Sequence, residues 1–442
     1  MLLSLGASAQ SFRGGYFLDN YVYGYRINPA QVNEKSFFGI GIGDIDLLNN
    51  SNMGMSSLLF NRNNSVVTGL HKSVTADEFI GGLSKNGNNF ISLDENINIL
   101  SVGISNGERM HTVELNVRVM NTDNLPTDLF SFIKKGGTGN FSFGGLYVDL
   151  SAMADLAYGY SMRISDNLSV GGRAHLLLGL VNVNLSGENT AISLSEQQIK
   201  VTPNVDLKAS GLLNIGTTAD GAIDPSGIGI SKNPIGGFGA SLDLGVDYKS
   251  DFGLEAMFSI TDLGLISWKN NFSASSSFEF SFEGLQNVNP LDSEALANQI
   301  GSLTDDLVGG IMPKIGQGKS SASFMPFNIA AGARYFMPFY DKLSVGALMT
   351  YHNAKYASWF DARLGATVTP INLVSISANA GAGTFGPVCG AALNLHLGPV
   401  NLHAGIDGFF GKYGKISGVP IPLKKFMENV NVGLCFTFGG KK

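Results

Sequence analysis

The chain has 442 residues, which is enough for two or three soluble domains or for one large closed sheet. Only 14% of the residues are charged and 44% are hydrophobic, whereas a typical soluble domain is roughly 25% charged. The net charge of −6 is small and spread along the chain, which excludes a nucleic-acid binder with a basic face.

No stretch of the sequence is long enough for a transmembrane helix. The longest apolar run, at 175–183, is interrupted by Gly179 and is far shorter than the ~20 residues needed. A membrane protein without such helices must be a closed β-barrel, because only a closed sheet pairs every backbone group within lipid. A soluble all-β protein is the alternative.

Residues 1–9 are expected to be the remnant of a signal peptide. Ala7 and Ala9 fit a signal-peptidase site, and the apolar residues before them resemble the end of a hydrophobic signal region. Cleavage is expected after Ala9, and the alternative is an ordinary flexible N-terminus. The segment that follows is rich in tyrosine and lacks alternation, and Pro29 would break a strand ladder.

Through most of the remaining chain, apolar and polar residues alternate with the two-residue period of β-strands. In the stretch at 110–120, for example, Val113 and Leu115 share one face and Glu114 lies on the other. The polar faces are rich in Gly, Ser and Asn, which favours a membrane barrel with a polar lumen over a soluble sandwich. Aromatic residues that would form interfacial girdles lie near strand ends, among them Tyr335, Phe336, Tyr351, Trp359 and Phe360.

Turns and helices complete the predicted topology. Short turns are expected at 165–167, 249–251, 338–341, 369–371 and 398–399, and longer connections at 352–358, 381–386 and 408–428. Their alternation predicts tight periplasmic turns, larger outer loops and about 14 strands, with 12 or 16 as alternatives. Helical inserts are predicted near 75–83, 126–136 and 291–309, the first of them from the capping box Thr75-x-x-Glu78.

Four motifs resemble a family of uncharacterised bacterial outer-membrane barrels that is distantly related to FadL-type transporters and to PorV-like proteins of type IX secretion. They are Asn28-Pro29-Ala30, the stretches at 146–150 and 261–268, and the final stretch at 432–438. The resemblance implies an all-β transmembrane barrel at 37–442, with an N-terminal hatch at 10–36 inside the lumen. The chain departs from the usual pattern at its end, where Gly439 to Lys442 follow the aromatic Phe438.

Patterns that would indicate catalysis are weak. Ser105 stands in a nucleophile-elbow pattern, but Asn106-Gly107 predicts a hairpin turn there. His396, His403 and Asp407 are expected to face the lumen, with Ser375 and Ser377 one hairpin earlier, so a Ser/His/Asp site is one interpretation. The favoured interpretation is a hydrogen-bonded polar network in the lumen, formed by Asp149, Asp155, Arg334, Asp361, Arg363, His396, His403 and Asp407.

No zinc-binding or phosphate-cradling pattern is present, so no enzyme, metal or cofactor is expected. Cys389 and Cys435 lack metal-type spacing and are expected to be free thiols on opposite faces of the sheet.

The resemblance implies a protein of the bacterial outer membrane and leaves two functions open. The first is FadL-like passive transport of small hydrophobic molecules. The second is a PorV-like role as a partner or anchor for secreted or surface proteins, reached through the outer loops. The expected partners are therefore outer-membrane lipid and either a small hydrophobic ligand or another protein, without nucleic acid.

Overall fold

The protein is described here from a computed structural model. It describes residues 12–62, 65–195, 198–202, 204–217, 223–231, 234–276, 280–282, 314–316, 320–408, 412–416 and 419–439. The predicted remnant at 1–9 and the predicted helix near 291–309 lie outside these residues.

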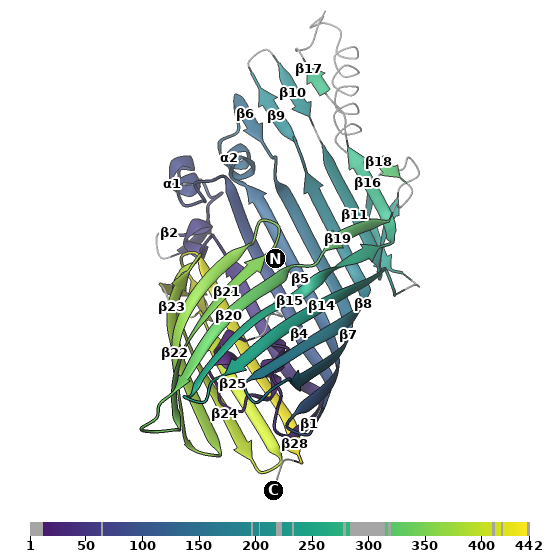
Figure 1. Ribbon diagram of the computed structural model, residues 1–442. Coiled ribbons are helices and arrows are strands. Elements are labelled where there is room, and N and C mark those ends of the chain that lie inside the picture. The colour runs from purple at the N-terminus through teal and green to yellow at the C-terminus, as the bar shows by residue number, and fades with distance from the viewer. Residues whose placement is uncertain are drawn as a thin grey trace, which may run out of the picture.

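Among the described residues, fourteen antiparallel strands form one closed barrel, as predicted (Figure 1). The ring closes because β1 pairs with β4 on one side and with the last strand, β28, on the other. Every strand in the ring therefore has two neighbours, and the sheet has no exposed edge in the membrane. In ring order the strands are β1 (Ser36–Ser51), β4 (Asn88–Ser105), β5 (Arg109–Pro126), β7 (Leu146–Arg163), β8 (Leu168–Gly187), β14 (Gly237–Lys249), β15 (Leu254–Trp268), β20 (Phe327–Phe336), β21 (Leu343–Asn353), β22 (Trp359–Ile371), β23 (Val374–Gly383), β24 (Gly386–Leu397), β25 (Val400–Asp407) and β28 (Phe426–Phe438).

The alternation in the sequence becomes an apolar outside and a polar lumen. On β5, Val113 and Leu115 are 42% and 36% exposed on the outside, whereas Glu114 between them is 1% exposed and faces inward. Exposed aromatics gather at both ends of the strands, as membrane girdles do. They include Phe252, Phe339, Tyr340 and Phe438 at one end, and Phe238, Phe324 and Phe360 at the other. Trp359 was expected in a girdle, but it is 2% exposed and faces the lumen, because it alternates with the outward Phe360.

The two ends of the barrel differ in their connections. At the end that contains the C-terminus of β28, the strands are joined by short turns at 106–108, 164–167, 250–253, 337–342, 372–373 and 398–399. Two predicted connections were wrong. The turn expected at 369–371 lies at 372–373, because Ile371 pairs with Val374, and the long connection expected at 381–386 is a tight turn closed by the pair Gly383–Gly386.

The other end carries the longer connections and extra secondary structure. The strands β11 (Val205–Gly211), β16 (Asn270–Ser276), β18 (Lys314–Gly316) and β19 (Ser321–Phe324) extend the barrel sheet there. A separate four-stranded sheet contains β6 (Gly139–Ser142), β9 (Ala191–Leu194), β10 (Ile199–Thr202) and β17 (Phe280–Phe282). Three hairpins pair β2 (Leu59–Arg62) with β3 (Ser65–Thr68), β12 (Leu213–Thr217) with β13 (Ile223–Ile230), and β26 (Tyr413–Ile416) with β27 (Val419–Pro422). Figure 1 shows that this wall, from β5 to β16, rises well above the strands β21 to β25 opposite.

Helices are short. The structure has α1 (Ala76–Gly81) and α2 (Thr127–Lys135) within two of the predicted inserts, and the Thr75 hydroxyl accepts a hydrogen bond from the Glu78 N–H, as a capping residue does. The 3₁₀ helices are η1 (Arg13–Tyr16), η2 (Val22–Arg26) and η3 (Met55–Ser57). Within the described ranges, no helix is both long and apolar enough to cross a membrane.

Candidate functional site

The segment at 12–35 lies inside the barrel. It fills the part of the lumen that lies beside the short strands β20 to β25. Glycines on the inner wall make room for it: Phe12 lies against Gly405, and Phe17 against Gly365. A Cβ added to Gly171 would come within 2.0 Å of the Pro29 carbonyl oxygen. At these positions on the inner face of the barrel wall, the segment approaches so closely that only glycine fits.

Polar contacts fix the same segment to strands on several sides of the ring. The Gly14 N–H donates to Asp407 (2.9 Å), and Arg334 donates to Asp19. Ser259 donates to the Ile27 carbonyl at 2.7 Å. These anchors lie on β25, β20 and β15, so the segment is held across the lumen rather than along one strand.

The Asn28-Pro29-Ala30 motif lies against β8 and β14. The Asn28 side chain accepts from the Ala30 N–H at 3.1 Å, which closes a tight turn, and it donates to the Val246 carbonyl at 3.2 Å. Pro29 and Ala30 pack over Gly171 and Gly245. The motif is thus a turn shaped to fit the inner wall.

Arg26 is the most extensively bound side chain of the segment. Its guanidinium group donates to Glu114 at 2.6 and 3.0 Å and to Asp44, and it lies 4.3 Å from the centre of the Tyr23 ring. The Tyr25 hydroxyl also donates to Glu114, at 2.7 Å. Burial alone would lower the pKa of Arg26, but Glu114 and Asp44 raise it well above its ordinary value, so the group stays charged.

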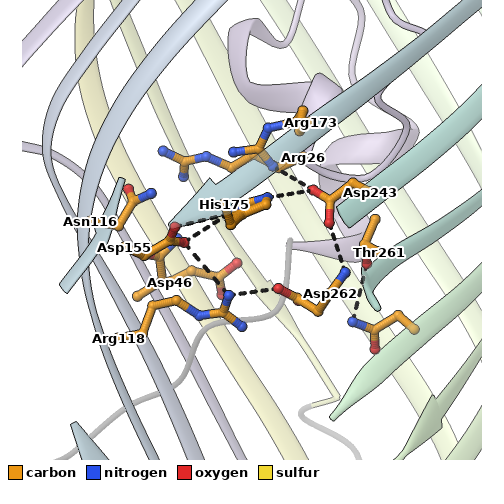
Figure 2. Close-up of a pocket in the computed structure, with 12 residues that line it drawn as sticks. Arg26, Asp46, Asn116, Arg118, Asp155, Arg173, His175, Asp243, Thr261 and Asp262 are labelled. Carbon is orange, nitrogen blue, oxygen red and sulfur yellow. Dashed lines mark hydrogen bonds and ion pairs between the residues drawn. The ribbon is translucent and has the colours of Figure 1, made fainter. Parts of the chain in front are cut away.

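A charged chamber lies beside Arg26 (Figure 2). Its cavity is about 40 Å³, which is room for a few water molecules. His175 bridges Asp155 (2.9 Å) and Asp243 (3.0 Å), and Arg173 also donates to Asp243 at 3.0 Å. On the far side, Arg118 lies 2.6 Å from Asp262 and 3.6 Å from Asp155. The complete lining is Arg26, Asp46, Asn96, Asn116, Arg118, Asp155, Arg173, His175, Asp243, Thr261, Asp262 and Asn328.

Asp262 is held in a strained conformation at a bulge in β15. Its φ is 63°, in the left-handed region that costs a non-glycine residue about 1–3 kcal/mol. The pairing of β14 with β15 shifts at this point, and the Asp262 N–H donates to Asp243 at 2.7 Å. The bulge turns the Asp262 carboxylate toward Arg118 and so completes one side of the chamber.

The inner wall of the barrel carries more buried acidic than basic side chains when the N-terminal segment is not counted. Among the described residues, the buried carboxylates are eight: Asp44, Asp46, Asp94, Glu114, Asp155, Asp243, Asp361 and Asp407. The buried arginines are six, of which Arg118, Arg173, Arg334 and Arg363 belong to the wall and Arg13 and Arg26 to the segment. His175 and His403 each contact a carboxylate. The segment therefore supplies positive charge that the wall lacks.

Two apolar clusters face the lumen nearer the end with the long connections. Arg13 lies 4.6 Å above the Trp359 ring in the first, which contains Leu48, Phe90, Ala357, Trp359, Phe385, Val388 and Met427. The second contains Met153, Leu177, Ile266, Trp268 and Met325. Both lie between the mouth of the barrel and the charged chamber, and they are rich in aromatic and methionine side chains.

The residues predicted to form one lumen network lie in separate groups. Arg363 bridges Asp361 and Asp407, both at 2.8 Å. His403 contacts Asp44 at 2.7 Å. The remaining predicted members lie elsewhere: Asp155 in the chamber, Arg334 at Asp19, Asp149 at Asn182 (3.0 Å) and His396 at Asn401 (2.9 Å).

The residues of the suggested Ser/His/Asp site have other partners. His403 contacts Asp44, Asp407 contacts Arg363, and Ser375 accepts from the Asp19 N–H at 3.2 Å. Ser105 ends β4 and donates to the Asn33 carbonyl, beside the hairpin turn that Gly107 makes with a φ of 85°. In the part of the chain that the structure describes, no three His, Cys, Asp or Glu side chains are arranged to hold a metal ion. Neither Cys389 nor Cys435 forms a disulfide in the described part of the chain, as predicted.

The central residues of the site were not among those predicted. Glu114 and Arg118 stood on the polar face of a recognised strand, so their inward direction was available from the alternation. His175 stood in a stretch considered only for its apolar residues, and Arg26 lies in a segment without periodicity. Only the fold brings Arg26 to Glu114, which is 88 residues away in the chain.

A closed ring of antiparallel strands with an apolar outside and a polar lumen defines a transmembrane β-barrel. The chain belongs to the family of unknown function DUF5723, which matches residues 29–407. No curated protein matches the sequence.

Several solved structures are similar to this chain at very low identity. The toluene transporter TbuX of Ralstonia pickettii has a TM-score of 0.47 and 8% identity, with 95% of this chain and 94% of that chain covered. A FadL homologue of Pseudomonas aeruginosa has a TM-score of 0.46 and 12% identity, with 96% and 95% covered. The toluene transporter TodX of P. putida has a TM-score of 0.44 and 9% identity, with 96% and 95% covered. The predicted relation to PorV-like proteins stays a prediction.

Proposed function

We propose that the protein is an outer-membrane channel through which small hydrophobic molecules pass passively when its N-terminal segment moves. The observation that carries the proposal is the order of features along the lumen. Aromatic and methionine clusters lie below the mouth, the charged chamber lies beneath them, and the segment at 12–35 fills the barrel. The side chains of these clusters are buried against one another here, and they would offer apolar surface to a solute from outside once the segment moves.

The charged chamber explains why the segment has to move. An apolar solute cannot replace water around buried ion pairs without a large desolvation penalty, and the cavity of about 40 Å³ is too small for one. Arg26 is the part of the chamber that belongs to the segment rather than to the wall. Displacement of the segment would therefore open the chamber from one side.

A disulfide between the segment and the wall tests the proposal. An ideal Cβ on Gly365 would lie 2.7 Å from the Phe17 Cγ, which brings the two Cβ atoms near the ~3.5–4.5 Å of a disulfide. Phe17→Cys with Gly365→Cys, in a chain that carries Cys389→Ser and Cys435→Ala, should lock the segment in place. We expect uptake of a radiolabelled aromatic hydrocarbon into proteoliposomes to fall to the background when the pair is oxidised and to recover on reduction.

The matched controls are Phe17→Cys with Gly365→Ser and Phe17→Ser with Gly365→Cys in the same background, because each changes both side chains to a similar size without the cross-link. Their uptake should not respond to oxidant. Uptake by the fully oxidised double variant at the rate of its reduced form would overturn a channel opened by the segment.

A second candidate, a partner or anchor for secreted or surface proteins, rests on the wall that rises beyond the rim. There the extensions β11 and β16 and the separate sheet of β6, β9, β10 and β17 present protein surface outside the barrel. This candidate predicts a stoichiometric protein companion after cross-linking in the native membrane and gentle solubilisation. Recovery of monomer alone would count against it.

A further inference from the structure

We propose that the wall site formed by Asp44 and Glu114 binds a small guanidinium- or ammonium-bearing solute when Arg26 leaves it. The N-terminal segment would then act as a built-in ligand that competes with cations for this site. The inference rests on the proposed movement of the segment, and it adds a ligand class that differs from the hydrophobic solute.

The site is built to hold one guanidinium group. Glu114 on β5 accepts two hydrogen bonds from Arg26, and Asp44 on β1 accepts a third from the other side. The Tyr23 ring lies 4.3 Å from the guanidinium carbon, but it belongs to the segment and leaves with Arg26. The wall itself supplies two carboxylates at the edges of the planar cation, which are contacts by which proteins recognise guanidinium.

Two buried amide oxygens beside Asp44 provide further acceptors. Asn98 pairs with Asp44 across β1 and β4, and Asn431 donates to Asp44 at 2.9 Å. Both side chains are at most 1% exposed, and neither Oδ1 has a hydrogen-bond partner among the described residues. These two oxygens could accept hydrogen bonds from the additional N–H groups of a free cation, which Arg26 does not supply to them.

The charge of the wall makes a replacement necessary. With the segment withdrawn, eight buried carboxylates face only the four arginines of the wall and the two histidines that contact them. Removal of one partner of a buried ion pair is strongly destabilising. Glu114 would keep Arg173, whereas Asp44 would keep His403 and the amide of Asn431 but no arginine. A cation from solution at this site would therefore stabilise the displaced state.

Arg26→Ala would leave room for such a cation beside Asp44 and Glu114, because the Arg26 guanidinium occupies the space between these carboxylates and borders the chamber. Free guanidinium at about 10 mM, far below denaturing concentrations, should therefore restore thermal stability that Arg26→Ala loses. We expect guanidinium chloride to raise the Tm of Arg26→Ala by several degrees relative to tetramethylammonium chloride at equal ionic strength. Arg26→Lys, which keeps the charge, should show no such difference, nor should Arg26→Ala combined with Glu114→Gln.

A second readout needs no change at Arg26. Cys435 is fully buried beneath Tyr21 and Tyr23 of the segment, so its labelling by a small thiol reagent reports displacement. In a chain with Cys389→Ser, guanidinium should speed this labelling several-fold over tetramethylammonium. Equal Tm values and equal labelling rates with the two cations would overturn the inference. Neither readout requires hydrophobic uptake, so a failed transport assay would leave both interpretable.

Discussion

Gly171 and Gly172 are adjacent on β8 but face opposite sides of the wall. A Cβ on Gly171 would come within 2.0 Å of the Pro29 carbonyl, whereas a Cβ on Gly172 would meet nothing closer than 3.3 Å. Backbone atoms cannot yield as the end of a flexible side chain can. The same substitution at these two positions therefore distinguishes the loss of a glycine from β8 from a displacement of the N-terminal segment.

We expect Gly171→Ala to push residues 28–30 from the wall and to loosen the whole segment. In planar bilayers the variant should open more often than the wild type, and its Tm should fall because close contacts are lost. Gly172→Ala should behave like the wild type in both measurements. If both variants open equally often, the fit of Asn28-Pro29-Ala30 to the wall does not hold the barrel closed.

At the scale of single elements, the short helix α1 has few local interactions that stabilise it. The helix has only one and a half turns, and its N-terminal cap is the bond from the Glu78 N–H to the Thr75 hydroxyl (3.2 Å). Arg62 also pairs with Glu78 at 2.5 Å, but this pair is at the surface and contributes little. The cap is therefore the main local determinant of the helix.

Thr75→Ala removes this cap, which is typically worth about 1 kcal/mol. We expect faster amide exchange at 76–81, with no change in the Tm of the barrel, because the insert lies outside the closed ring. Thr75→Ser keeps the hydroxyl and should exchange at the wild-type rate. Unchanged exchange in Thr75→Ala would mean that packing of Phe79 against Phe60 and Phe130 holds the helix instead.

The elements also show which features a single sequence could predict. Strands such as β5 and β28 were recognisable because one face meets lipid and the other the lumen, so that apolar and polar residues alternate strictly. Turn positions were less certain: Pro370 suggested a turn, but it lies within β22, and the reversal occurs two residues later. Trp359 was assigned to the wrong face because aromatics at strand ends serve both the girdle and the lumen.

The candidate site was less predictable than the fold. Alternation gives the direction of Asp361, Arg363 and Asp407, and these three do meet. It cannot give the partner of Arg26, because the segment that carries Arg26 has no period. Nor does it predict the bulge at Asp262, which depends on how β14 and β15 lose register.

At the scale of the whole molecule, the acidic wall predicts the ion selectivity of an emptied barrel. Deletion of residues 12–35 removes Arg13 and Arg26 and leaves eight buried carboxylates with four arginines. We expect the deleted barrel to conduct and to prefer cations, because a lumen lined by one sign of charge concentrates counter-ions. The reversal potential under a potassium chloride gradient measures this preference.

The matched control is the same deletion combined with Asp46→Asn and Asp94→Asn, two wall carboxylates that form no ion pair closer than 4 Å among the described residues. Its cation preference should be weaker. A deleted barrel that prefers anions would contradict the assignment of the wall as acidic.

The anchors of the N-terminal segment also constrain the order in which the barrel assembles. Arg13 reaches Met427 across 414 residues of sequence, and Gly14 reaches Asp407 across 393. The N-terminal segment thus finds its partners on the last strands of the chain, and contacts this distant in sequence form late. The closure of the ring joins Ser36 to Phe438 across a similar separation, so we expect the lumen to fill as the ring closes, and a chain without β28 to have both an open barrel and an unanchored segment.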